Sequence, residues 1–156
     1  MMSRVRRFLL LPMLASLVVT ACDPGLTLEP VGWTPAGHLQ WEAESDGVHF
    51  VVSSLGGLVG SEYESFELTV QNRTSSHFVV DEALLETNGK IYKAETPREI
   101  TEKWPSVSPG STEQISLLWS LDGPLDEVFD ETAALRVAFH LGATEHGIRI
   151  DFRRRD

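Results

Sequence analysis

The sequence is poor in cysteine, with Cys22 as the only one in 156 residues. An intramolecular disulfide is therefore excluded, and the folded part of the chain has to be stabilised by packing and hydrogen bonding alone. We expect that part to fold without an oxidant. A single cysteine in an exported protein needs another explanation, and the position of Cys22 after a short apolar segment supplies one.

Long apolar runs are also missing. The longest, Phe8 to Ala21, is mainly apolar and has 14 residues, whereas a helix that spans a bilayer needs about 20. Arg4, Arg6 and Arg7 precede this run, and no acidic residue interrupts it. A basic start followed by an apolar run of this length is typical of an export signal.

Basic residues are scarce. The chain holds 13 Lys and Arg against 23 Asp and Glu, a formal net charge of −10, and three of the basic residues precede the apolar run. Nucleic acid and anionic lipid headgroups repel an acidic surface of this kind. We expect no nucleic-acid partner, and the acidity either keeps the protein soluble or attracts a cationic partner.

Catalytic motifs are missing as well. The sequence contains no G-x-S-x-G elbow, no phosphate-binding loop, no dinucleotide-binding glycine pattern and no H-E-x-x-H pair. We therefore expect neither enzyme activity nor a bound cofactor.

The apolar run ends in Val18-Val19-Thr20-Ala21-Cys22, which resembles the lipobox of bacterial lipoproteins. The resemblance implies that the Cys22 thiol receives a diacylglycerol, that a peptidase cuts between Ala21 and Cys22, and that the new amine is acylated. Each buried CH₂ of the acyl chains contributes about 0.8 kcal/mol, so such an anchor is effectively permanent. An ordinary secretory signal with an incidental cysteine is the alternative.

A lipidated Cys22 implies a bacterial protein whose domain lies outside the cytoplasm, in the periplasm or at the cell surface. Asp23 follows the cysteine, and in some bacteria this position marks retention in the inner membrane. We leave the choice between inner and outer membrane open. Arg6-Arg7 faintly resembles a twin-arginine export signal, which leaves that export route open too.

Residues 22–37 contain Pro24, Pro30 and Pro35 together with three glycines. Spaced prolines favour an extended, semi-rigid chain that rises about 3 Å per residue. We predict that residues 1–21 are the signal peptide, that residues 22–37 are a lipidated tether and that residues 38–156 form the folded domain. Such a tether reaches at most roughly 45 Å.

From residue 38 onward, apolar and polar residues alternate in short runs separated by turns, as in half-buried strands. Ile115, Leu117, Trp119 and Leu121 give the cleanest alternation, and Asn88-Gly89 is a strong hairpin signal because both residues accept a positive φ. Only residues 124–129 suggest a helical turn. The pattern predicts an all-β antiparallel sandwich of seven or eight strands.

The order of these runs, from FELTVQN through the Asn-Gly hairpin and VSPGSTEQISLLW to two final strands, resembles bacterial immunoglobulin-like domains of envelope lipoproteins. The resemblance covers about Tyr63 to Arg153. The paired cysteines of antibody domains are absent. The resemblance implies a sandwich that binds or scaffolds rather than one that catalyses a reaction.

Candidate contact and ligand residues are few. Trp104, in a proline-rich segment, is the best candidate for an exposed partner contact. His140 and His146 flank the last hairpin and could face each other across it. With no metal-ligand spacing among the histidines we expect no metal, although a metal or small-ligand carrier is the alternative function. The five histidines are His38, His49, His77, His140 and His146.

Two further motifs favour structural interpretations. The acidic loop Asp122 to Glu131 lacks the EF-hand ligand spacing, so we expect Asp122 to cap a helical turn. Asn72-Arg73-Thr74 matches a glycosylation sequon, but a turn is the simpler interpretation. The most concrete function that these residues predict is a lipid-anchored, non-enzymatic module that binds a protein or polymer of the cell envelope.

Overall fold

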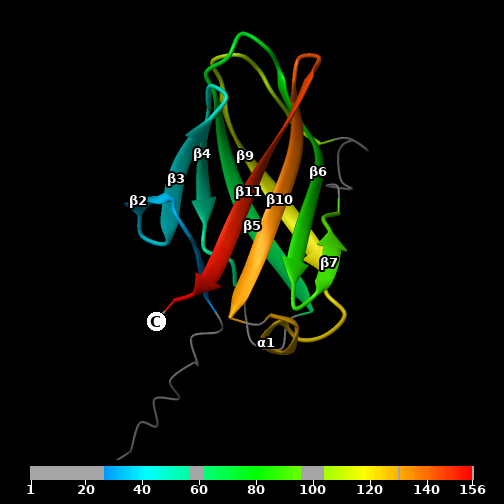
Figure 1. The fold of residues 1–156 in the computed structure, drawn as a ribbon. Helices are drawn as coiled ribbons and strands as arrows, with labels where there is room; N and C mark the ends of the chain where they lie inside the picture. The colour runs from blue at the N-terminus through cyan, green and yellow to red at the C-terminus, as the bar shows by residue number, and fades with distance from the viewer. Residues whose placement is uncertain (1–26, 57–61, 96–103, 130, 156) are drawn as a thin grey trace, which may run out of the picture.

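The alternating runs fold into two antiparallel sheets packed face to face, which confirms the predicted β-sandwich (Figure 1). The computed structural model describes residues 27–56, 62–95, 104–129 and 131–155, and these contain eleven strands rather than seven or eight. Sheet A runs in the order β1 (Leu28–Pro30), β11 (Thr144–Arg154), β10 (Thr132–Leu141), β6 (Phe78–Thr87) and β7 (Lys90–Lys93), with β8 (Ser106–Val107) also beside β6. Sheet B runs in the order β2 (Thr34–Gly37), β3 (Gln40–Ser45), β4 (Val48–Ser53), β5 (Tyr63–Asn72) and β9 (Thr112–Ser120).

Aromatic rings on the inward faces join the two sheets. Phe50 of sheet B lies with its ring centre 5.8 Å from that of Phe139 and 6.1 Å from that of Phe78, both on sheet A. Phe66 of sheet B meets Phe152 of sheet A edge to face at 5.7 Å. All five side chains are buried. Each contributes about 1.5 to 3 kcal/mol by burial, so the core stabilises the domain without a disulfide.

The predicted boundary between tether and domain at residue 38 is wrong, because residues 28–30 and 34–37 form β1 and β2. Leu28 is only 1% exposed, and its backbone exchanges two hydrogen bonds with Leu55, at 2.7 and 3.0 Å. β1 pairs with β11 and β2 with β3. Strands of three or four residues are too short to show alternation in the sequence, and prolines are tolerated on edge strands. Both strands lie at a sheet edge, so Pro30 and Pro35 fit there.

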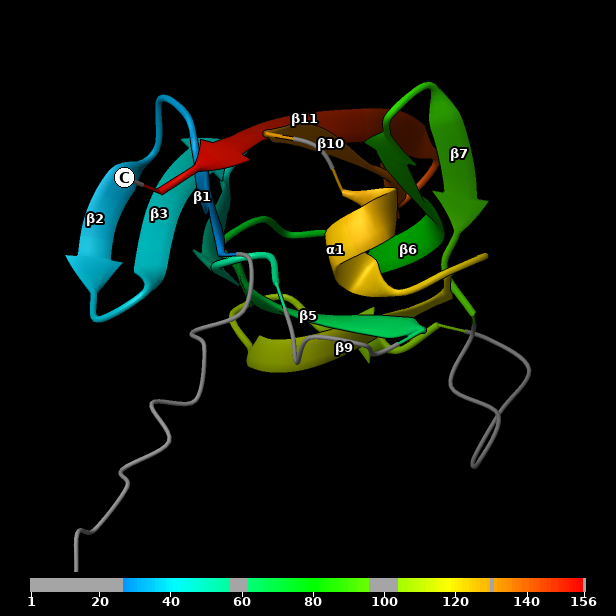
Figure 2. The ribbon, with the colours of Figure 1, turned by 90° about the horizontal axis from the view of Figure 1, so that it is seen from below.

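The hairpin and the helical turn agree with the sequence. Asn88 and Gly89 have φ values of 47° and 74° and join β6 to β7. α1 (Leu125–Val128) lies across one end of the sandwich, between the two sheets (Figure 2). Val128 and Phe129 are buried there. Among the described residues, none of the helices is long and apolar enough to cross a membrane.

The turn after β5 is organised by a buried amide. Asn72 is 0% exposed, and its Nδ2 donates to the carbonyl oxygens of Ser76 at 2.7 Å and Val107 at 2.9 Å. Its Oδ1 accepts from the backbone N–H of Thr74 at 3.0 Å and from the Thr74 hydroxyl at 2.7 Å. The sequon at this position therefore forms a turn, and its asparagine is buried rather than presented for glycosylation.

Candidate functional site

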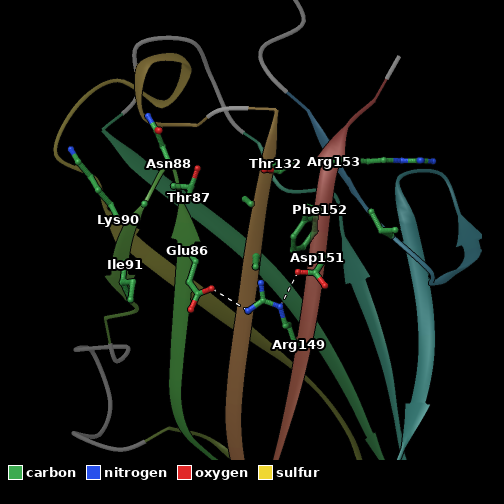
Figure 3. Close-up of a pocket in the computed structure, with 14 residues that line it drawn as sticks. Glu86, Thr87, Asn88, Lys90, Ile91, Thr132, Arg149, Asp151, Phe152 and Arg153 are labelled. Atoms are coloured by element: carbon green, nitrogen blue, oxygen red, sulfur yellow. Dashed lines mark hydrogen bonds and ion pairs between the residues drawn. The ribbon is translucent and has the colours of Figure 1, made fainter.

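A shallow trough of about 570 Å³ crosses the outer face of sheet A, at the end of the sandwich where α1 lies (Figure 3). Ala134 of β10 forms the floor of the trough. The strand register places it opposite Glu86 of β6 on one side and Asp151 of β11 on the other. Ala134 is 5% exposed although it faces outward. Its small side chain leaves the hollow between longer neighbours. The lining residues are Val31, Glu86–Ile91, Thr132–Ala134, Arg149 and Asp151–Arg153.

Apolar side chains stand at both ends of the trough. Ile91 of β7 lies opposite Glu86 and is 65% exposed, and Val31, which follows β1, is 45% exposed. The backbone N–H of Val31 donates to the Asp151 carbonyl at 2.8 Å, which fixes Val31 beside β11. Four large hydrophobic side chains of the described residues are exposed, and two of them line this one hollow. An exposed apolar side chain beside a concave polar surface is a common element of binding interfaces.

An ion-pair network crosses one side of the trough. The Arg149 guanidinium donates to the carboxylates of Glu86 at 3.1 Å and Asp151 at 2.9 Å (Figure 3). Arg136 reaches the same Glu86 at 2.7 Å. Hydrogen bonds to Glu86 and then to Asp151 raise the pKa of Arg149 further above its ordinary value. The network holds a planar donor group at a fixed place on the rim, and such groups are favoured where a protein recognises carboxylates.

The predicted lipidation and cleavage residues, Cys22 and Ala21, lie outside the described residues. Trp104 is described, and it is half-buried and packs against the core. Its ring is therefore partly used for structure rather than fully presented to a partner.

The histidines are dispersed, and three of them each contact a different carboxylate. His49 lies 3.1 Å from Glu42, His146 lies 3.2 Å from Asp46, and His140 contacts Asp81. Across the last hairpin His146 stands opposite Phe139 rather than His140, so the two histidines project from opposite faces of sheet A. The expectation that they could face each other is wrong. Among the described residues, no group of three or more His, Cys, Asp or Glu is placed to hold a metal.

The acidic loop that precedes α1 contacts β7 through Asp122. The Asp122 carboxylate accepts a hydrogen bond from Lys90 Nζ at 2.6 Å and another from the Tyr92 hydroxyl. The bond from Lys90 is the largest cause that lowers the pKa of Asp122, and burial followed by Asp122 raises the pKa of Tyr92 to about 12. Asp122, predicted as a helix cap, therefore fastens the strand that carries Ile91.

Sequence reasoning missed the trough. Its floor residue belongs to Ala133-Ala134, which looks like an unremarkable pair at the start of a strand. Arg149 and Asp151 occupy the outward parity of β11, where solvated charges are normal. A usable signal would have been the small residue on the outward parity of β10, since a small side chain between charged neighbours leaves a hollow.

Comparisons with known proteins include a weak structural likeness. No protein-family model matches the sequence, and no curated protein matches it. A solved structure of a FixG-related protein from Vibrio parahaemolyticus aligns with 72% of this chain and 99% of its own, at a TM-score of 0.39 and 11% sequence identity. A similarity at this level says nothing about what the chain binds.

Proposed function

We propose that the chain is a lipid-anchored bacterial envelope protein whose β-sandwich is a non-enzymatic binding module. The sheet A trough is the observation that carries this proposal. It combines two exposed apolar side chains, Ile91 and Val31, with a guanidinium held by two carboxylates. Interfaces favour this mixture of apolar anchors and fixed polar groups, whereas solvated strand faces of monomers are usually polar throughout.

The first described residue of the chain lies close to the end of β11. The backbone N–H of Arg155 donates to the carbonyl of Thr27 at 3.2 Å, so the first described residue lies beside the end of β11. Thr27 is five Cα–Cα steps after Cys22, and a chain of that length spans at most about 18 Å. A lipidated Cys22 would therefore hold this end of the sandwich near the membrane. An extended partner at the membrane surface would then reach the trough from the side.

Lipidation is tested by changing Cys22 to serine. We expect this variant to lose all incorporated fatty acid, because serine lacks the thiol that accepts the diacylglycerol, and to keep a folded sandwich, because no disulfide is lost. Metabolic labelling with an alkyne fatty acid measures the first, and circular dichroism of the purified protein measures the second. Asp23→Asn is the matched control and should keep its lipid. A Cys22→Ser protein that still carries lipid would refute the anchor.

The binding site is tested by crosslinking in the native cell. A photoreactive residue in place of Ile91 should give one reproducible adduct, identified by mass spectrometry, and the same residue in place of Ser116, on the exposed face of sheet B, should not. Arg149→Glu should reduce the Ile91 adduct by about tenfold, since an ion-pair contact in an interface is worth about 1 to 2 kcal/mol. If the photoreactive residues at Ile91 and at Ser116 gave the same adducts, the trough would not be the binding site.

A further inference from the structure

β7 presents an open strand edge. Within the described part of the chain β7 pairs only with β6. The two-residue Asn88-Gly89 turn makes Thr87 and Lys90 the first hydrogen-bonded pair of the hairpin. From that pair onward, hydrogen-bonded pairs alternate with pairs whose main-chain groups do not bond to the opposite strand. The N–H and C=O groups of Ile91 and Lys93 therefore point away from β6.

Just after β7, the same edge of the chain pairs with β9. Glu95 has the same parity as Ile91 and Lys93, and its N–H donates to the Leu118 carbonyl of β9 at 2.8 Å. Ala94, on the alternate parity, donates to Ala83 of β6 at 2.8 Å, as the register requires. The Glu95 bond shows that the outward-pointing N–H and C=O groups of this edge are able to pair with a strand. The corresponding groups of Ile91 and Lys93 are not paired with β9.

The side chains of β7 favour a particular partner. Ile91 is 65% exposed between two lysines whose side chains are 56% and 69% exposed. Lysine on an edge strand prevents pairing with another copy of the same edge. A pair of two β7 strands would bring four lysines and no acidic residue into one two-stranded ladder, which is repulsive. A second copy of this chain is therefore disfavoured, and an acidic strand is favoured.

We infer, resting on the proposed binding function, that the partner adds an extended strand to the free edge of β7. An apolar side chain of the partner packs on Ile91 at the end of the trough, and acidic residues three positions apart face Lys90 and Lys93. The lysines now pair with Asp122 at 2.6 Å and Glu82 at 2.7 Å. Such exposed pairs contribute little to stability, so the lysines are available to a partner carboxylate. Main-chain hydrogen bonds supply affinity and the alternating side chains supply specificity, as in other cases of strand addition.

The test uses two short peptides and the full chain purified in mild detergent. One peptide has the core Glu-Val-Val-Glu flanked by threonines, and the other replaces both glutamates by lysine. The first core reads the same in both directions, so it suits a parallel or an antiparallel added strand. We expect the acidic peptide to bind at least about tenfold more tightly, measured by fluorescence anisotropy. We also expect the bound peptide to slow amide exchange at Ile91 and Lys93.

Variants of β7 sharpen the test. Lys90→Glu combined with Lys93→Glu should reverse the preference between the peptides. Ile91→Pro removes a free-edge N–H without removing a hydrogen bond to β6, and Ile91→Ser removes only the apolar contact; each should weaken binding by about fivefold or more. Gln114→Ser, on the exposed face of sheet B and outside the trough, is the control and should change binding less than twofold.

The outcomes separate this inference from the proposed function. Equal binding of both peptides, no binding of either, or an unchanged affinity of both Ile91 variants would overturn strand addition. If the crosslinks at Ile91 persisted in those cases, the trough would still bind its partner in another way. Loss of those crosslinks would instead overturn the binding site itself.

Discussion

Replacing Asn72 with alanine is expected to lower the free energy of unfolding by about 3 kcal/mol, since each buried polar group left without a partner costs about 1 to 3 kcal/mol. The amide of Asn72 is fully buried and takes part in four hydrogen bonds. Alanine would leave the buried carbonyl of Val107 without this donor and the turn at Thr74 without its acceptor. The turn joins β5 of sheet B to β6 of sheet A, so its loss weakens the connection between the sheets.

Urea unfolding followed by tryptophan fluorescence measures this change. Gln71→Ala is the matched control, because Gln71 is the neighbouring residue with its side chain on the outer face, where it accepts from Arg73. Its replacement should cost less than about 0.5 kcal/mol, as is usual for surface positions. Asn72→Asp keeps the shape and the acceptor but loses both donated bonds, and it should also destabilise the protein. A loss below 1 kcal/mol in both Asn72 variants would contradict this role.

The sequence predicted those parts of the fold that depend on residues close together in the chain. The alternation of Ile115, Leu117 and Trp119 is a property of one strand, and these residues are all buried in the core. The Asn88-Gly89 turn is equally local. β1 has three residues, and its assignment depends on pairing with β11, which lies more than 100 residues later. No periodicity in the sequence reports such a pairing.

The candidate site depends on pairings of this non-local kind. The trough forms because Ala134 on β10 happens to stand between Glu86 and Asp151, on strands 48 and 17 residues away in the sequence. Asp122 shows the same limit, because its interpretation as a helix cap used only its neighbours, whereas Lys90 lies 32 residues before it. Residue types predicted a binding module, but the position of the candidate surface depends on the strand register, which they do not report.

A buried carboxyl at the α1 end of the sandwich makes stability depend on pH. Glu64 of β5 is 1% exposed, and its Oε1 accepts from the backbone N–H of Gly56 at 2.9 Å. Its Oε2 and the indole Nε1 of Trp119, the residue opposite Glu64 on β9, have no hydrogen-bond partner among the described residues. Burial, opposed in part by the Gly56 bond, raises the pKa of Glu64 from 4.5 to about 7.

Because the folded chain holds this proton more tightly than the unfolded chain, Glu64 stabilises the fold fully only below pH 4.5. That contribution decreases as the pH rises and is lost above pH 7. A shift of this size corresponds to about 3 kcal/mol between pH 4 and pH 8. Glutamine cannot ionise and keeps the acceptor for Gly56, although its amide donor is left without a partner, at a cost of about 1 kcal/mol.

Glu64→Gln is therefore expected to raise the free energy of unfolding at pH 8 by about 2 kcal/mol and to lower it by about 1 kcal/mol at pH 4.5. Urea unfolding of both proteins across this pH range measures the crossing of the two curves. Glu67→Gln is the control on the same strand, since Glu67 lies on the outer face and accepts from the Ser116 hydroxyl at 2.9 Å. Its effect should be small and nearly constant with pH. Parallel stability curves for Glu64→Gln and the unchanged protein would show that Glu64 is already ionised without cost in the folded state.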